Sequence, residues 1–225
     1  MERIYKQLQD SALFEGFKVN EIESLLKEHH YISKKFSKDQ VVAIEGDAIK
    51  TLGIILSGEV AVKKVYETGK TLQVRSLKKG DLIGNPTVFA DCNYYPSTII
   101  CKTVTEILFV SQKDIGDMCM AHRGFFENFV KILSNQVIYL SEKVKFISFG
   151  TIRKKITHYL LTEYKRQNDK MVKVAVRTKM AEMFGVSRPA LSNELIRMKA
   201  DGLIEYNKDY IKILDVDKIE LELEK

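Results

Sequence analysis

The sequence is poor in proline and cysteine, with three of each among 225 residues. Because prolines are few and no low-complexity run occurs, we expect only short flexible linkers. The cysteines Cys92, Cys101 and Cys119 are odd in number and form no Cys-x-x-Cys pair, which argues against a disulfide framework and a structural zinc site. Reduced thiols are the expectation.

Long hydrophobic runs are also missing. No stretch approaches the roughly 18 consecutive apolar residues of a membrane span, and residues 1–7 lack the apolar region of a signal peptide. We therefore expect a cytoplasmic protein that has no membrane partner. The sequence also shows no nucleophile–base pair, no Gly-Lys-Ser/Thr phosphate loop and no cluster of metal ligands, so an enzyme is not expected.

Length and hydrophobic content predict two packed domains. The chain exceeds the commonest single-domain size, and its 45% of hydrophobic residues suffices for real cores. The charge is unevenly distributed between the parts. Residues 150–199 contain twelve Lys or Arg and four acidic residues, whereas the whole chain has a net charge of +6. A local positive field of this kind favours binding to the phosphate backbone of DNA.

The first half of the chain changes from helical to β character. Residues 1–30 predict a short helical lead-in, with apolar residues on one helical face. From Tyr31 to about Val110, short β-rich runs alternate with glycine-containing breakers, among them Ser57–Glu59, Thr68–Lys70 and Lys79–Asp81. Many short strands at near-regular spacing predict an antiparallel sandwich or barrel.

A long helix is predicted from about His122 to Ile147. Apolar residues recur along it at alternating spacings of four and three, which is a heptad seam that favours pairing with a second copy of the chain. A second apolar stripe, containing Phe125, Phe129 and Ile138, favours packing of the same helix on its own β-domain; both interpretations can hold at once. The predicted dimer seam consists of Phe126, Val130, Leu133, Val137, Leu140, Val144 and Ile147.

The strongest local pattern lies in residues 177–198 and predicts a helix-turn-helix. Two short helices that meet at a steep angle need a small residue at their approach, a turn residue that tolerates positive φ, and an apolar residue that docks the second helix. Ala181, Gly185 and Leu191 have these properties at spacings of four and six. Gly150 ends the long helix, so the DNA-binding domain is expected to begin there.

The second helix of this motif is expected to read DNA. Ser187 is a suitable N-cap, and Pro189 fits the first turn, where a missing N–H costs nothing. We expect Arg188, Ser192 and Asn193 to contact base edges in the major groove.

Three further groups are better suited to phosphates. Arg177, Ser187 and the helix N-terminus should contact the DNA backbone. Residues 203–206 and 210–214 flank Asn207-Lys208-Asp209, which predicts a hairpin or wing with Lys208 at its tip as another backbone contact. The alternative is a C-terminal module that binds protein, with charges that are merely solvated.

The order of these parts resembles the CRP/FNR family of bacterial transcription regulators over nearly the whole chain. The most specific stretches are residues 79–84 (Lys-Gly-Asp-Leu-Ile-Gly), 141–144 (Ser-Glu-Lys-Val), 185–188 (Gly-Val-Ser-Arg) and Leu203-Ile204. The resemblance implies an α+β fold with three parts. These are a cyclic-nucleotide-binding-like β-roll sensor domain in residues 1–120, a dimerisation helix in 121–149 and a winged helix-turn-helix DNA-binding domain in 150–225.

The resemblance also implies an effector pocket, formed here by Gly84, Asn85, Ser97, Thr98, Leu140 and Ser141. Cyclic-AMP-binding members have a glutamate where this chain has Asn85, an arginine–serine pair where it has Pro96-Ser97, and a threonine–serine pair where it has Leu140-Ser141. No Lys, Arg or His occurs between Asp81 and Cys101 to hold a phosphate. The sequence therefore argues against cyclic AMP, and the effector is either another molecule or none.

The sequence is compatible with some of the family's other sensing chemistries and not with others. An iron–sulfur cluster with four cysteine ligands is excluded within one chain by the cysteine count. Haem stays open, as does a redox-sensitive thiol at Cys92. Candidate haem ligands are His29, His30, His122, Met118 and Met120.

Taken together, these features predict a homodimeric regulator that binds a near-palindromic promoter site in double-stranded DNA. If it is an activator, RNA polymerase is a further partner. FNR-type recognition helices place a glutamate and a serine–arginine pair at the positions of Pro189, Ser192 and Asn193, so the DNA sequence recognised is expected to differ.

Overall fold

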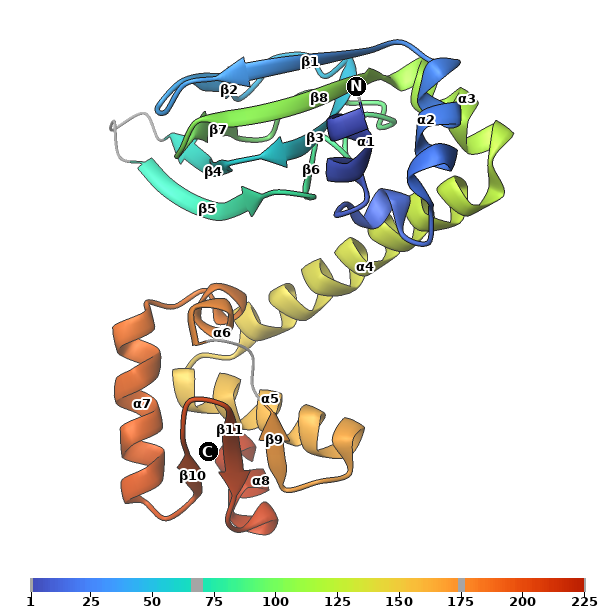
Figure 1. Ribbon diagram of the computed structural model, residues 1–225. Coiled ribbons are helices and arrows are strands. Elements are labelled where there is room, and N and C mark those ends of the chain that lie inside the picture. The colour runs from blue at the N-terminus through green and yellow to red at the C-terminus, as the bar shows by residue number, and fades with distance from the viewer. Residues whose placement is uncertain (1, 66–70, 174–176, 225) are drawn as a thin grey trace. The chain divides into compact units, whose positions relative to one another are not determined.

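The computed structural model describes residues 2–65, 71–173 and 177–224. The chain divides into two compact units, Met1–Gln136 and Val137–Lys225. The boundary falls inside the long helix α4 (Arg123–Ser148), which contributes residues to both cores (Figure 1). Phe125 and Phe129 are buried in the first core, whereas Phe146 is buried in the second. The long helix therefore belongs to both units and is no separate body.

The chain begins with the helical lead-in that the apolar pattern predicts. Each short helix buries its apolar face in the first core, for example through Leu8 and Ile22. Ser11 starts the middle element, because its Oγ accepts a hydrogen bond from the backbone N–H of Leu13. The elements are α1 (Glu2–Leu8), η1 (Ala12–Phe14) and α2 (Val19–Lys27).

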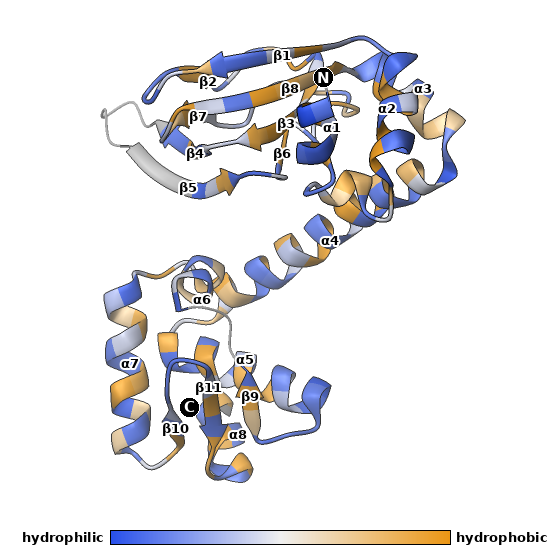
Figure 2. Cartoon of the chain, viewed as in Figure 1, coloured by the Kyte–Doolittle hydropathy of each residue, from blue (hydrophilic) through white to orange (hydrophobic). Residues whose placement is uncertain are grey.

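Eight antiparallel strands then form two four-stranded sheets, in the orders β1-β8-β3-β6 and β2-β7-β4-β5. Residues of both sheets share one core, so the structure is a sandwich, which is one of the two architectures that the sequence predicts. Strands β3 and β8 are hydrophobic along much of their length (Figure 2). The strands are β1 (Tyr31–Phe36), β2 (Val41–Ala43), β3 (Thr51–Ser57), β4 (Glu59–Val65), β5 (Thr71–Lys78), β6 (Leu82–Ile83), β7 (Thr98–Cys101) and β8 (Thr105–Ser111).

Two of the predicted glycine breakers are close-packed turns. Gly58, between β3 and β4, has φ +89°, and a Cβ there would lie 2.5 Å from the carbonyl oxygen of Val104. Gly80 has φ +86°, and a Cβ would lie 2.4 Å from the carbonyl oxygen of Asp10. Only glycine fits such approaches at positive φ. The third breaker, Thr68–Lys70, lies outside the described residues.

The first core is closed by helices that follow the sandwich. Ser111 caps α3 (Gln112–Ala121), and its Oγ accepts a hydrogen bond from the backbone N–H of Asp114. Ile115 and Met118 of α3 are fully buried. The largest fully buried side chains of this unit are Tyr5, Leu8, Leu13, Phe14, Ile22, Leu26, Ile49, Leu52, Ile54, Ile55 and Phe125.

The second unit combines helices with a three-stranded antiparallel sheet in the order β10-β11-β9. Leu160, Phe184, Leu195 and Ile213 lie in its core. The sequence predicts the β10–β11 hairpin but not β9 or the last helix. The elements are α5 (Ile152–Gln167), β9 (Met171–Lys173), α6 (Arg177–Phe184), α7 (Arg188–Ala200), β10 (Ile204–Tyr206), β11 (Tyr210–Ile213) and α8 (Val216–Glu224).

Hydrophobic side chains fill the two cores, and others are exposed along α4. Figure 2 shows hydrophobic and hydrophilic segments alternating along α4. Among the described residues, no helix has both the length and the apolar character needed to cross a bilayer.

Candidate nucleic-acid interface

Helices α6 and α7 form the helix-turn-helix that the sequence predicts. Gly185 has φ +66° between them, and the backbone N–H of Val186 donates to the carbonyl oxygen of Ala181 at 3.0 Å. Ala181 is buried, and Leu191 of α7 is fully buried in the same core. The small residue, the left-handed glycine and the docking leucine therefore fix α7 on the rest of the unit.

The N-terminus of α7 is capped by Ser187. Its Oγ accepts a hydrogen bond from the backbone N–H of Ala190 at 3.3 Å, and Pro189 lies in the first turn. The cap leaves other N–H groups of the first turn pointing out of the helix end, where phosphate binds well. Ser187 and Arg188 are both exposed at this end.

The predicted base readers do not all lie on one side of α7. Leu191, Leu195 and Met198 face the core, and successive residues of a helix are about 100° apart. Asn193 therefore points almost directly away from the core. Arg188 lies about 140° from Asn193 around the axis, and Ser192 lies between them and is half-buried.

One exposed residue of α7 was not among the predicted site residues. Ile196 is 57% exposed on the same outward side as Asn193. Its i+3 spacing from Asn193 places the two side chains next to each other on the helix surface. Amphipathic patterning alone does not identify an exposed isoleucine as a candidate DNA contact.

The wing is a tight hairpin next to α6. The Oδ1 of Asn207 accepts hydrogen bonds from the backbone N–H groups of Asp209 and Tyr210, at 2.8 and 3.0 Å. Lys208 is exposed at the tip. Arg177 is braced on this hairpin, because it donates to the carbonyl oxygen of Asn207 at 3.4 Å. Its guanidinium also lies 4.8 Å from the centroid of the Tyr206 ring.

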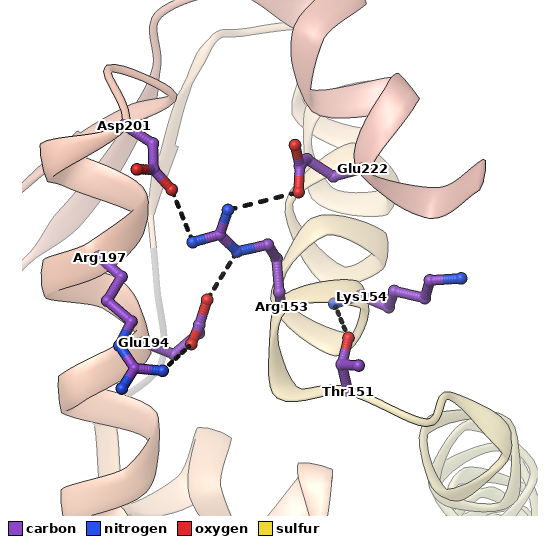
Figure 3. Close-up of polar contacts among 7 residues, drawn as sticks. All are labelled: Thr151, Arg153, Lys154, Glu194, Arg197, Asp201 and Glu222. Atoms are coloured by element: carbon purple, nitrogen blue, oxygen red, sulfur yellow. Dashed lines mark hydrogen bonds and ion pairs between the residues drawn. The ribbon is translucent and has the colours of Figure 1, made fainter. Parts of the chain in front are cut away.

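Arg153, at the start of α5, is an ion-pair centre that the sequence analysis missed (Figure 3). Its Nε donates to Glu194 Oε1 at 2.6 Å, and its Nη2 lies 2.7 Å from Asp201 Oδ2. Its third contact, at 3.5 Å, is Glu222 of α8. Burial opposes the charge, but the hydrogen bonds to Glu194 and Asp201 outweigh it and raise the pKa of Arg153. Arg153 therefore ties α5 to α7 and α8.

Several basic residues of the segment 150–199 are engaged in contacts within the second unit. Arg153 is surrounded by carboxylates, Lys155 donates to the carbonyl oxygen of Phe184 at 2.8 Å, and Arg166 pairs with Glu163 at 2.6 Å. The basic residues that remain for DNA are therefore fewer than the sequence count suggests.

Two of the predicted effector-pocket residues, Asn85 and Thr98, form hydrogen bonds with distant parts of the first unit. Asn85 is only 6% exposed, and its Nδ2 donates to Gln136 Oε1 of α4 at 3.0 Å. The Oγ1 of Thr98 accepts from the backbone N–H of Glu45 at 3.1 Å. Ser97 is buried, and Gly84 has φ +82°. None of these residues offers a cation to a cyclic phosphate.

The predicted dimer seam on α4 is exposed at six of its seven positions. The exception is Leu133, which is half-buried against the first core. Ile138, which the sequence assigns to the packing stripe, is also exposed. Ser141, the last of the predicted pocket residues, is exposed as well. The exposed seam residues are Phe126, Val130, Val137, Leu140, Val144 and Ile147.

The candidate haem ligands have other surroundings. Met118 is fully buried in the core, and Met120 is 90% exposed. The Nδ1 of His29 lies 3.5 Å from Asp114 Oδ1, and the ring of His122 lies 4.5 Å from that of Phe17. His30 is exposed. These placements give haem no support.

The cysteines are scattered. Cys92 is exposed, whereas burial raises the pKa of the Cys101 and Cys119 thiols and makes them less reactive. Among the described residues, the one group with potential metal-ligand spacing is His29, Asp114 and Asp117, which contains no cysteine.

Comparison with known proteins identifies two domain families and several relatives of the chain. Residues 33–122 match the cyclic nucleotide-binding domain, and residues 154–221 match the Crp-like helix-turn-helix domain. The chain is 25% identical to the cAMP-activated global transcriptional regulators CRP of Salmonella typhimurium and Klebsiella aerogenes over 181 residues. That alignment covers 78% of this chain and 86% of each relative.

Solved structures share the fold. The Catabolite Activator Protein of Thermus thermophilus matches with a TM-score of 0.56 and 17% identity, over 95% of this chain and 98% of that one. A CooA mutant from Carboxydothermus hydrogenoformans matches with a TM-score of 0.58 and 21% identity, over 88% and 89%.

A cyclic-nucleotide-binding-type sandwich joined to a winged helix-turn-helix defines a DNA-binding transcription regulator, and the protein is not an enzyme. The two domain matches, in the same order as in the CRP relatives, together cover most of the chain. The chain belongs to the CRP/FNR family of transcription regulators.

Proposed function

We propose that this regulator acts in the cytoplasm as a homodimer that binds a near-palindromic promoter site, with α7 of each subunit in the major groove. The observation that supports this most is α7 itself, which has a capped N-terminus and exposed Arg188 and Asn193. Arg can pair with guanine and Asn with adenine. Two such helices related by a twofold axis would read half-sites about one helical turn (~34 Å) apart.

The exposed stripe of α4 supports the dimer. Six large apolar residues at heptad spacing remain in contact with water in the single chain. Burying each of them against a second copy contributes up to roughly 1.5–3 kcal/mol. Pairing of two α4 helices would therefore bury apolar residues that the fold of a single chain leaves exposed.

The effector is proposed to be a molecule other than cyclic AMP, or none. The hydrogen bond between Asn85 and Gln136 occupies a predicted pocket position, and the segment from Leu82 to Ile100 contains no cation. RNA polymerase would be a further partner if the regulator is an activator.

The test replaces Arg188 and Asn193 by alanine and measures binding to a site selected from randomised duplexes. We expect at least a tenfold loss of specific affinity, because two base contacts disappear. A matched control replaces Asn20 and Arg123, an exposed pair of the same residue types in the first unit. Circular dichroism and mass by light scattering should be unchanged in both variants. Unaltered specific binding by the α7 variant would contradict the proposal.

A further inference from the structure

The outward side of α7 is an uncharged stripe between charged flanks. Pro189, Asn193 and Ile196 are exposed, and their spacings of four and three place them within about 60° of one another around the helix. From Pro189 to Ile196 the helix rises about 10.5 Å, which is close to the length of three base pairs. The stripe is therefore long enough to face about three base pairs.

Cations lie beside this stripe and not in it. Around the helix, Arg188 lies about 80° from Ile196, and Arg197 lies about 40° from Asn193 at the opposite edge of the stripe. Arg197 also lies 3.5 Å from Glu194, which draws its guanidinium toward the side of the helix. Arg197 at one edge suits a phosphate that borders the groove. Arg188 at the other edge remains the proposed reader of a guanine, and the middle faces three further base pairs.

The chemistry of the stripe matches A·T pairs. Asparagine pairs with adenine through N6 and N7, and thymine is the base with a methyl group in the major groove, where apolar side chains contact it. The stripe offers no guanidinium or ammonium to guanine, and cytosine would leave Ile196 without a methyl partner. We propose that the three base pairs facing Pro189, Asn193 and Ile196 are A·T pairs, with Ile196 against a thymine methyl group. This inference rests on the proposed function and specifies the DNA sequence class that it recognises.

Single exposed aliphatic residues are common on protein surfaces, so the test must compare Ile196 with another exposed aliphatic residue. Leu221 of α8 is a suitable match, being 54% exposed against 57% for Ile196. Both belong to the same unit, and Leu221 lies outside α7. Alanine at either position removes apolar surface that already faces water, and both variants should fold.

The experiment selects binding sites from randomised duplexes with the full-length dimer. Each thymine of the enriched half-site is then replaced by deoxyuridine, which keeps every hydrogen-bonding group and lacks only the methyl group. Removing one buried methyl should weaken wild-type binding about fourfold at the position facing Ile196. The Ile196→Ala variant should lose this discrimination, and the Leu221→Ala variant should keep it.

The outcomes separate the two proposals. If no sequence is enriched, the proposed function itself is wrong. If a site is enriched but has G·C pairs at the three positions, the function stands and the inference is wrong. The inference also fails if deoxyuridine has no effect, or has an equal effect on wild type and Ile196→Ala. Asn193→Ala is expected to relax the preference for adenine at one position while the methyl effect persists.

Discussion

The Nε of Arg153 donates a 2.6 Å hydrogen bond to Oε1 of Glu194, so a side chain at the start of α5 holds the middle of the recognition helix. The same guanidinium contacts Asp201, seven residues further along and directly after α7. Two attachment points about two turns apart resist both rotation and sliding of the helix. Arginine suits this role because its planar group donates in several directions at once.

Replacing Arg153 by methionine should lower the free energy of unfolding by about 2 kcal/mol, a value reduced from that of fully buried pairs because the side chain is partly exposed. The loss arises because the half-buried Glu194 and the buried Glu222 would lose their ion pairs with Arg153. Urea denaturation measures the effect. Lysine at this position should restore only part of the loss, since one ammonium cannot span three carboxylates.

The control for Arg153 is Arg166→Met, which removes an exposed pair with Glu163. Such pairs add little to stability. Equal destabilisation by the two substitutions would show that the Arg153 contacts have no special weight.

The hydrogen bond from Asn85 to Gln136 should contribute to the stability of the first unit. The Gln136→Ala variant leaves a buried amide without an acceptor, at an expected cost of about 1–2 kcal/mol in unfolding free energy. Chemical denaturation of the full chain provides the measurement. Asn135→Ala, at the neighbouring exposed position of α4, should cost much less, and a similar loss in both would argue against the bond.

Lysines at Leu140 and Val144 should yield monomers. Both residues are exposed on the seam, so the substitutions insert charge into the proposed interface without entering a core. Leu133 is the wrong choice for this purpose, because it packs against the first core. Sedimentation equilibrium gives the mass. Lysines at Asn135 and Glu142, exposed residues off the seam, serve as the control, and a dimer that survives the seam substitutions would contradict the interface.

Acid should weaken the second unit through His158. Burial, together with the positive charges of Lys145 and Lys165, lowers the pKa of His158 below its ordinary 6.5. The unfolded chain therefore binds a proton first as the pH falls through 6.5, and the folded state loses stability below that value. Urea denaturation at pH 8 and pH 5.5 measures the difference.

In the His158→Phe variant this part of the pH dependence should disappear, because the residue no longer titrates. The Phe146 and Phe149 rings, 5.7 and 5.0 Å from that of His158, offer an apolar environment to the new ring. His30→Gln, an exposed control, should leave the slope in place. A slope that survives in His158→Phe would point to another group.

Ser187 should have two separable roles. Ser187→Ala removes the acceptor for the Ala190 N–H and should cost about 1 kcal/mol of unfolding free energy. Ser187→Asp keeps a capping oxygen and hence the stability, but adds negative charge at the end of α7 that is proposed to contact phosphate, so operator affinity should drop. Parallel measurements of unfolding and of DNA binding distinguish the two effects. Normal DNA binding by Ser187→Asp would place this helix end away from phosphate.

Local sequence patterns predict the elements that are determined by residues close together in the sequence. The turn at Gly185 follows from spacing, and so does the wing around Asn207. Local patterning does not identify strand β1, because most of its residues are exposed and its pairing with β8 holds it in place. Strand β9 has three residues, of which only Val172 is buried, so its alternation is too short to recognise.

The contacts missed at the site are those between distant parts of the chain. Arg153 looked like one of twelve basic residues, because its partners lie 41 and 69 positions away along the chain. The Asn85–Gln136 bond spans 51 positions. Periodicity places a side chain on a face of its own helix, but it does not identify what another element brings to that face.

The uncharged stripe of α7 has a consequence for how promoters would compete at changing ionic strength. Phosphate contacts release counterions, so overall affinity falls steeply as salt rises. Contacts of Asn193 and Ile196 with bases involve no net charge and should change little. The ranking of strong and weak operators would then persist in cells whose salt content varies, although occupancy of every operator declines.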